Sequence, residues 1–306
     1  MPTQRPKNEF DAVVVGGSYA GLSAALQLAR ARRRVLVLDA GQRRNRFTSH
    51  SHGFLTQDGR DAAAIVAKGR AQLLAYSTVT WQDGSAVAAA ANDGGFRVTL
   101  DSGELLQARR LVLATGVVDE LPQLEGLAER WGRSVFSCPY CDGYELDQGS
   151  IGVLATGPLS IHQALMLPDW GKTTLFLNGA FEPDDEQLSS LVQRGVTIER
   201  TPVARIAGKA DVVLSDGRIQ SMAGLFVMSR THAASPLAEQ LGCAFDEGMT
   251  GMFIRTDMQK ASTVAGVYCC GDAARMAPGV AHAVADGVMA GVAAHRSLIF
   301  GAVAAV

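Results

Sequence analysis

Two cysteines with two residues between them, Cys138 and Cys141, are the side chains in this sequence best suited to chemistry. Thiols at this spacing either bind a metal or cycle between dithiol and disulfide. A structural zinc site normally has four ligands, and no second Cys or His pair is spaced to supply the other two. The remaining cysteines are Cys243 and the adjacent Cys269 and Cys270. The spacing therefore favours a redox-active pair, with chance occurrence as the plain alternative.

Length and composition leave room for two compact domains and argue against several partners. The chain has 306 residues, is 47% hydrophobic and carries a net charge of -2, so neither nucleic acid nor an anionic membrane is expected to bind. The apolar C-terminal region is interrupted by Asp286, His295 and Arg296, which predicts a docked amphipathic helix and not a membrane span. We expect a cytoplasmic protein. Persistent disulfides are rare in that compartment, which again favours a catalytic pair.

A strand, a glycine-rich turn and a helix open the sequence. The apolar run over residues 11–15 leads into Gly16-Gly17-Ser18-Tyr19-Ala20-Gly21 and then into an alanine- and leucine-rich helix. A second apolar strand, residues 35–38, ends in Asp39, which lies 18 residues after Gly21. This order predicts a βαβ unit that binds a dinucleotide.

Each residue of that unit has an expected task. Gly16 permits the tight turn, and Gly21 lets the helix approach the strand closely. The helix N-terminus receives the pyrophosphate, and Asp39 holds the adenosine ribose hydroxyls. Ser18 stands where the motif has its middle glycine, which weakens the match.

A second unit of the same kind is eroded. A strand over residues 151–155 is followed by a turn, a helix through Leu167 and a strand over residues 173–177. Ala155 stands where the first glycine belongs, and Ser160 stands at the third small residue. The pattern therefore predicts the fold more firmly than a ligand.

The later parts of both units also repeat. Hairpin turns at residues 100–104 and 214–218 are each followed by an apolar strand, at residues 111–114 and 224–228. The sequence thus predicts two Rossmann-like halves.

One more strand, residues 266–270, ends in Gly271 and Asp272 before a long helix that starts at about Gly279. Its plain interpretation is a closing strand and helix. Its functional interpretation is that Asp272 hydrogen-bonds a polyol while the helix N-terminus faces an electron-rich ring.

Together these motifs resemble the low-molecular-weight thioredoxin reductase family of flavoproteins over nearly the whole chain. The resemblance rests on the Gly16–Gly21 turn, the Ala114-Thr115-Gly116 strand end, the Cys138–Gly143 motif and the Gly271-Asp272 element, in family order and spacing. It implies an α/β fold of two Rossmann-like, three-layer domains and a homodimer. The implied FAD-binding domain is discontinuous, residues 1–118 and 245–306, and residues 119–244 form an inserted NAD(P)-binding-like domain that carries the cysteine pair.

The resemblance also implies the site residues. Cys138 faces the substrate, Cys141 faces FAD, and Asp142 moves protons, with a helix-capping carboxylate as the alternative for Asp142. No metal is implied. The implied FAD contacts are Gly16, Ser18, Ala20, Gly21, Asp39, Asn45, Thr115, Gly116, Gly271, Asp272, Val280 and Ala281.

The second unit departs from the family where NADPH would bind. Residues 178–185 form an acidic loop without arginine, whereas the family places arginines there for the 2'-phosphate. Carboxylates repel that phosphate and offer it no bidentate partner. Lys172 and Arg194 are the only nearby cations in the sequence. We expect the nicotinamide site to be disabled.

A second departure resembles the gliotoxin- and holomycin-type dithiol oxidases. It consists of residues 42–46, the Ser49-His50-Ser51-His52-Gly53-Phe54-Leu55 stretch and Gly143-Tyr144-Glu145. It implies oxidation of a small-molecule dithiol, with electrons passing through Cys138 and Cys141 to FAD and then to O2, giving H2O2. His50 and His52 are either aids to proton removal or ordinary exposed loop histidines.

Two alternatives stay open. The first is a thioredoxin or protein-disulfide reductase fed by ferredoxin, NADPH or another donor, since the cysteine pair works in both directions. The second is a non-catalytic flavin-binding scaffold.

Overall fold

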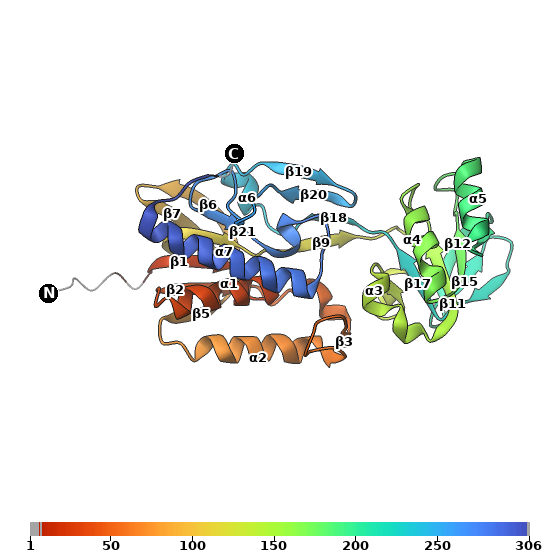
Figure 1. Cartoon of the computed structure of the whole chain (residues 1–306), viewed down its shortest axis with the longest axis horizontal. Helices are drawn as coiled ribbons and strands as arrows, with labels where there is room; N and C mark the ends of the chain where they lie inside the picture. The colour runs from red at the N-terminus through yellow and green to blue at the C-terminus, as the bar shows by residue number, and fades with distance from the viewer. Residues whose placement is uncertain (1–5, 7, 305–306) are drawn as a thin grey trace. The chain divides into compact units, whose positions relative to one another are not determined.

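The computed structural model describes residue 6 and residues 8–304, and it separates them into two compact units (Figure 1). Unit 1 comprises the chain up to residue 46, residues 63–118 and the chain from residue 231. Unit 2 comprises residues 47–62 and 119–230. The unit boundaries differ from the expected segments 1–118, 119–244 and 245–306, because residues 47–62 pack with unit 2 and residues 231–244 with unit 1. The assignment of those segments to particular ligands stays a prediction.

Unit 1 is built on a seven-stranded sheet in the order β5-β2-β1-β8-β7-β6, with β21 paired to β8. The strands β5, β2, β1, β8 and β21 run parallel, and β6 and β7 continue from β8 as an antiparallel meander. The sheet strands are β1 (Glu9–Val15), β2 (Val35–Asp39), β5 (Val79–Asp83), β6 (Ala86–Asn92), β7 (Gly95–Leu100), β8 (Leu105–Leu113) and β21 (Val267–Cys269).

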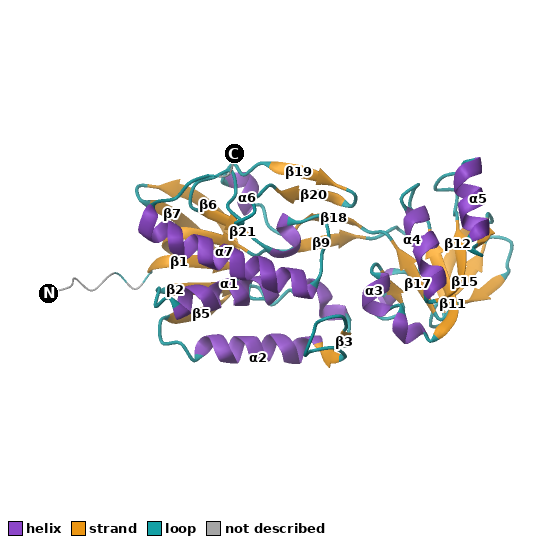
Figure 2. Ribbon diagram, viewed as in Figure 1, coloured by secondary structure: helices purple, strands orange, loops and turns teal. Residues whose placement is uncertain are grey.

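Helices and short strands complete unit 1, and Figure 2 distinguishes them by colour. The helices are α1 (Tyr19–Arg30), α2 (Ala62–Leu74), α6 (Leu237–Gln240) and α7 (Val280–Phe300), with the 3-10 turns η1 (Arg44–Phe47) and η5 (Gly271–Ala274). The strands outside the main sheet are β19 (Phe245–Gly248) and β20 (Gly251–Ile254). The strands β9 (Val117–Glu120) and β18 (Arg230–Ala233), which pair with each other, carry the chain between the units.

Alternation along β1 explains the three layers of unit 1. Ala12 and Val14 pack with the apolar faces of α1 and α7, whereas Val13 and Val15 pack with residues of β7 and β8 on the other side. All four side chains are buried, as is typical of a central parallel strand. The helices α1 and α7 lie side by side on one face of the sheet (Figure 1).

The closing helix α7 packs tightly on α1. A Cβ at Gly287 would lie 2.1 Å from the carbonyl oxygen of Ala20, and one at Gly291 would lie 2.4 Å from that of Ala24. By length and composition α7 could also cross a membrane, a criterion that core helices of other proteins meet as well; 44% of its apolar window is buried.

Unit 2 repeats this plan on a smaller scale. Its five-stranded sheet, β10-β17-β11-β12-β13, is parallel throughout, and an antiparallel meander, β14-β15-β16, covers one face. The sheet strands are β10 (Val135–Phe136), β11 (Gln148–Leu154), β12 (Gly171–Phe176), β13 (Thr197–Glu199) and β17 (Gly224–Val227), and the meander strands are β14 (Val203–Ala207), β15 (Asp211–Leu214) and β16 (Ile219–Ser221). The rest are α3 (Pro139–Asp142), α4 (Ser160–Met166), α5 (Asp185–Gln193), η2 (Ala128–Arg130), η3 (Tyr144–Leu146), η4 (Leu167–Asp169) and the hairpin strands β3 (His50–Ser51) and β4 (Arg60–Asp61).

The predicted duplication is confirmed at the hairpin turns. In unit 1 the N–H of Leu100 donates to the carbonyl of Glu104, and in unit 2 the N–H of Leu214 donates to that of Arg218, both at 2.9 Å. The turn joins β7 to β8 in unit 1 and β15 to β16 in unit 2. The expected architecture of two Rossmann-like domains with three layers is therefore correct.

Candidate active site

The first glycine turn of unit 1 admits only glycine at two positions. Gly16 has φ +104°, and a Cβ there would lie 2.2 Å from the carbonyl oxygen of Ala114. A Cβ at Gly21 would lie 1.7 Å from the carbonyl oxygen of Gly16. The start of α1 therefore rests directly on the turn. The first turn of α1, all of it described, contains no acidic residue, and its N-cap Ser18 makes no side-chain cap, which suits a bound phosphate.

Asp39 lies beside this turn at the carboxyl end of β2. Its Oδ1 accepts a hydrogen bond of 3.0 Å from the N–H of Gly17. A Cβ at Gly17 would lie 2.7 Å from the Asp39 Cβ and 2.3 Å from the Trp81 ring, so the turn, the acid and the ring are packed together. This is the position from which a carboxylate holds the ribose of a dinucleotide.

The Gly271-Asp272 element lies against the same helix start. Gly271 has φ +73°, and a Cβ there would come to 2.9 Å from the Cβ of Ala20. The Oδ2 of Asp272 pairs with Nη1 of Arg44 at 2.9 Å, and Nδ2 of Asn45 donates to the hydroxyl of Tyr19 at 3.1 Å. No motif in the sequence predicts that Arg44 pairs with Asp272.

The other expected cofactor residues stand at the ends of neighbouring elements of unit 1. Thr115 and Gly116 follow β8, and the Gly116 carbonyl accepts from the N–H of Ala234 at 3.2 Å. Val280, half-buried, and Ala281, exposed, begin α7. The expected residues thus gather around the carboxyl ends of parallel strands, where open α/β sheets bind ligands. The glycine cradle and the open helix start fit FAD, and the individual contacts remain predictions.

In unit 2, Cys138 and Cys141 form a disulfide with their Cα atoms 5.3 Å apart. Cys138 is the N-cap residue of α3, and the N–H of Cys141 donates to its carbonyl at 3.1 Å. Both cysteines are half-buried, so attacking thiols have partial access. Gln163, a buried residue of α4, donates from Nε2 to the Ser137 carbonyl at 2.7 Å. This bond holds the backbone directly before Cys138 in place. No motif in the sequence predicts this bond.

Three aromatic side chains lie on or against the short helices α3 and η3 next to the disulfide. A Cβ at Gly143 would lie 2.8 Å from Cδ1 of Trp170, so glycine lets this indole pack against α3. Trp170 meets Tyr140 edge to face, with ring centroids 5.3 Å apart. Tyr140 and Tyr144 are 73% and 85% exposed. Trp170 was missing from the sequence-based site because it lies 29 residues after Cys141.

Asp142 follows the second cysteine directly. Its pKa is raised to about 6, chiefly because burial disfavours the charged form; the nearby Glu145 raises it further, and His52 opposes the shift. The N-cap residues of α3 and of η3 are Cys138 and Gly143, so Asp142 caps neither helix. Its alternative role as a capping carboxylate is therefore wrong. A carboxyl group that titrates near neutral pH is suited to proton transfer.

The hairpin β3–β4 brings one of the two candidate histidines to Glu145, three residues after Asp142. Nδ1 of His52 lies 3.4 Å from Oε1 of Glu145 and 3.7 Å from Oδ1 of Asp58. His50 lies 6.4 Å away from His52 between ring centroids, is exposed, and hydrogen-bonds Ser49 through Nδ1 at 2.8 Å. The sequence predicted the same alternatives for both histidines, whereas in the structure only His52 contacts Glu145.

The second glycine-like turn, in unit 2, is closed from within. The N–H of Thr156 donates to the hydroxyl of the fully buried Ser160 at 3.0 Å. The N–H of Ala155 donates to the Phe176 carbonyl, which places Leu177, 2% exposed, where an acid would stand. The helix that follows, α4, has seven residues.

Two arginines near the acidic loop are already paired with carboxylates. Arg200, missed in the sequence because it lies beyond the loop, pairs with Glu182 at 2.8 Å. Arg194 pairs with Asp169 at 2.7 Å. A 2'-phosphate would have to displace these carboxylates before it gained a guanidinium partner.

The remaining cysteines belong to the interior of unit 1. Cys269 and Cys270 are fully buried and free, and Cys243 is also buried. The pKa of Cys243 is lowered to about 7 by a hydrogen bond with Cys269, with burial acting in the opposite direction. Within the described residues, no group of three or more His, Cys, Asp and Glu side chains could hold a metal ion.

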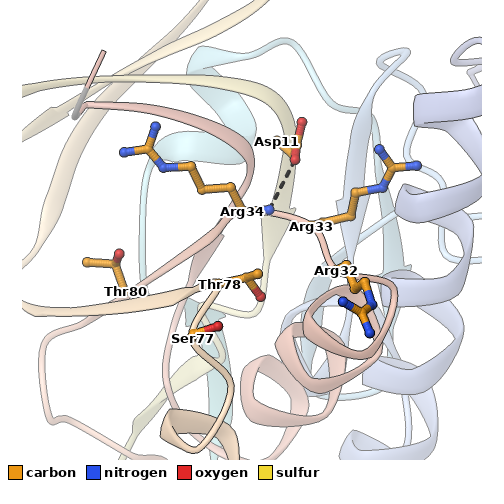
Figure 3. A pocket seen from close by; sticks show the side chains of 7 residues that line it. All are labelled: Asp11, Arg32, Arg33, Arg34, Ser77, Thr78 and Thr80. Atoms are coloured by element: carbon orange, nitrogen blue, oxygen red, sulfur yellow. Dashed lines mark hydrogen bonds between the residues drawn. The ribbon is translucent and has the colours of Figure 1, made fainter. Parts of the chain in front are cut away.

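A pocket of about 440 Å³ lies at the amino-terminal ends of the strands of the unit 1 sheet, where β2 and β5 begin. Its lining residues are Asp11, Arg32, Arg33, Arg34, Ser77, Thr78 and Thr80. The guanidinium groups of Arg33 and Arg34 point away from each other (Figure 3), and the Asp11 carboxylate accepts from the backbone N–H of Arg34 at 3.0 Å. These side chains do not converge on one anion.

Comparison with known proteins identifies the class. The model of the pyridine nucleotide-disulphide oxidoreductase family matches residues 10–287, and the chain belongs to this family. Membership makes it a flavin-dependent disulfide oxidoreductase and indicates FAD as its flavin.

Individual relatives narrow the class to thioredoxin reductase-like flavoproteins. The thioredoxin reductase sirT of Leptosphaeria maculans is 33% identical, over 92% of each chain. A solved oxidoreductase from Agrobacterium tumefaciens is 55% identical with a TM-score of 0.93, covering 95% of this chain and 99% of that one. The crystal structure of HlmI is 33% identical with a TM-score of 0.89, covering 97% and 95%. The resemblance inferred from the sequence is confirmed.

Proposed function

We propose that this chain is an FAD-dependent dithiol oxidase that forms a disulfide in a small-molecule dithiol and delivers the electrons to O2. One observation carries the proposal: the redox pair is intact, whereas the turn that should accept a nicotinamide cofactor is closed by Ser160 and lacks an acid at Leu177. Electrons therefore enter through the cysteines.

Exchange begins at Cys138. A substrate thiol loses its proton to the Asp142 carboxylate, and the thiolate forms a bond to Sγ of Cys138 while the Cys138–Cys141 bond breaks and its electron pair leaves on Cys141. The second substrate thiol gives its proton to the Cys141 thiolate, attacks the substrate sulfur bound to Cys138 and expels the Cys138 thiolate. The substrate has become a disulfide, and the enzyme holds a dithiol.

Unit 1 supplies the residues that would hold FAD. The Gly16–Gly21 turn and the start of α1 would bind the pyrophosphate, Asp39 the ribose, and Asp272 the ribityl chain. The chemistry that bound FAD supplies is two-electron exchange between the Cys138/Cys141 dithiol and O2, with H2O2 as product.

Exposed aromatic rings favour a small substrate. Tyr140 and Tyr144 offer flat, apolar surface beside the disulfide, with Trp170 supporting Tyr140. A compact dithiol attached to a ring system would stack on such surface.

Oxygen uptake tests the proposal. The FAD-loaded protein is mixed in air with dithiothreitol, and oxygen consumption and peroxide are recorded. We expect both, and expect Cys138→Ser and Cys141→Ser to fall to the rate of free FAD. Cys243→Ala removes a thiol outside the pair and should keep the activity. Equal oxygen uptake by the Cys138→Ser protein, or no uptake by the unmodified protein, overturns the proposal.

The runner-up is a thioredoxin or protein-disulfide reductase, which the name of one relative, thioredoxin reductase sirT, favours. Reduction of oxidised thioredoxin by the holoenzyme with NADPH or reduced ferredoxin, without oxygen uptake from dithiols, would establish it instead.

We also propose a cytoplasmic homodimer. A redox-cycling disulfide supports the location. Val288, Met289 and Val292 expose apolar surface on α7 that a second copy could cover. Light scattering of the purified holoenzyme tests the dimer, and fractionation of the cells that make it tests the location.

A further inference from the structure

The β3–β4 hairpin places His52 against Glu145, three residues after Asp142 in the chain. His52 lies 3.4 Å from Glu145, and both act on Asp142 with opposite sign. We propose that His52 and Glu145 form an ion pair that sets the proton affinity of Asp142 during thiol–disulfide exchange, so that both are positioning residues of this site. This inference rests on the proposed function for its catalytic consequence.

Charge and burial carry the argument. Asp142 is partly buried, so the field of nearby charges reaches it with less screening than at the open surface. Protonated His52 stabilises the Asp142 carboxylate, and Glu145 destabilises it. When His52 and Glu145 pair, the two influences partly cancel.

Two other titratable side chains, Asp58 and His50, lie near His52. Asp58, 71% exposed, faces His52 at 3.7 Å from the same hairpin. His50 lies next to His52 but bonds to Ser49. The side chain of His52 is 23% exposed and that of Glu145 is 41% exposed, so solvent can exchange protons with the pair.

The consequence for exchange is a divided task. Asp142 takes the proton from the incoming substrate thiol, and no proton has to reach His52. A protonated His52 makes the carboxylate form available at lower pH. Loss of the imidazolium raises the proton affinity of Asp142, and loss of the Glu145 charge lowers it.

Opposite shifts therefore distinguish this role from a structural one. The protein is labelled with ¹³C at aspartate Cγ, and the Asp142 signal, assigned through Asp142→Asn, is titrated in the FAD-loaded, oxidised protein. We expect His52→Asn to move the Asp142 midpoint upward and Glu145→Gln to move it downward, each by about 0.2 to 0.7 of a pH unit. His50→Gln, the matched control, should leave it in place. Shifts of the same sign, or none, overturn the inference.

A second readout separates this inference from the proposed function. The acid limb of the pH profile for oxygen uptake with dithiothreitol should follow the same order, His52→Asn above and Glu145→Gln below the unmodified protein. If the carbon signal shifts as expected but no dithiol oxidation occurs, the electrostatic role stands and the oxidase proposal fails. If oxidation occurs with an unmoved carbon signal, the oxidase stands and this inference fails.

Discussion

Each unit has a turn between its first Rossmann strand and the helix that follows. The two turns occupy equivalent positions but differ in the side chain that accepts their hydrogen bond. The N–H of Gly16 bonds to the Leu38 carbonyl, and the N–H of Ala155 bonds to the Phe176 carbonyl, so the turns are in the same register. The next amide donates to Asp39 in unit 1 and to Ser160 in unit 2.

The difference lies in what satisfies the turn. In unit 1 the partner of the turn is a carboxylate, whose remaining acceptor capacity can serve a ribose. In unit 2 the partner is a buried hydroxyl of the turn's own helix, and the residue in the place of Asp39 is the apolar Leu177. A Rossmann unit can thus keep its fold when a side chain of its own helix satisfies the turn, because backbone hydrogen bonds need a partner and not a particular one.

Substituting alanine for one glycine in each turn should give the largest difference between the two units. Gly21→Ala places a methyl group 1.7 Å from the Gly16 carbonyl oxygen, so the turn must open. We expect loss of about 3 kcal/mol of stability and purification without FAD. Gly157→Ala, the control in unit 2, meets nothing within 4 Å; its φ of +158° strains alanine and lowers stability, but the variant should retain FAD. Flavin absorbance and urea unfolding measure both effects; a flavin-loaded Gly21→Ala protein contradicts the assignment.

The acid of the first turn gives the next largest effect. Asp39→Ala removes the acceptor of the Gly17 N–H and the expected ribose partner. We expect FAD to bind about 10- to 100-fold more weakly, measured by fluorescence titration of the apoprotein. Asn178→Ala, just after Leu177, removes the acceptor of the Val203 N–H in unit 2 and should leave FAD binding unchanged. Equal weakening by both variants would remove the distinction between the turns.

If unit 2 serves thiol chemistry instead of nucleotide binding, ionisation of its buried acid, Asp142, should lower the free energy of unfolding. The pKa of Asp142 is raised from 3.8 to about 6, so the folded protein binds more protons than the unfolded chain between these values, and stability falls as pH rises through that window. We expect Asp142→Asn to be more stable than the unmodified protein by about 1 to 2 kcal/mol at pH 7.5, allowing for partial exposure, with little gain at pH 4.

Urea unfolding at the two pH values checks this prediction. Asp147→Asn is the matched control, because Asp147 is exposed and its left-handed backbone, φ +50°, suits asparagine. A gain that is independent of pH would mean that burial of the charged form is not the cause.

Local patterns in the sequence predicted the fold well. The run from residue 11 to residue 21 specifies a strand, a turn and a helix through neighbouring residues alone, and the same holds for the hairpin turns and the cysteine pair. Their geometry depends on residue type at fixed spacing, which a single sequence contains.

Pairings across the chain were beyond that reach. Gln163 holds the Ser137 carbonyl, His52 meets Glu145, and Arg44 meets Asp272, each between segments far apart in the sequence. Leu177 was identified as the counterpart of Asp39 only by the strand register. Such contacts follow from tertiary packing, on which spacing along the chain carries no information.

The direct test of the central claim is anaerobic reduction of the bound flavin in a stopped-flow instrument. The holoenzyme is mixed with dithiothreitol or with NADPH at equal concentration, and flavin absorbance is followed. We predict that dithiothreitol bleaches the flavin through Cys138 and Cys141, that Cys138→Ser abolishes this bleaching, and that NADPH leaves the flavin oxidised over the same period. Rapid bleaching by NADPH, in the unmodified protein and in Cys138→Ser alike, would contradict the account.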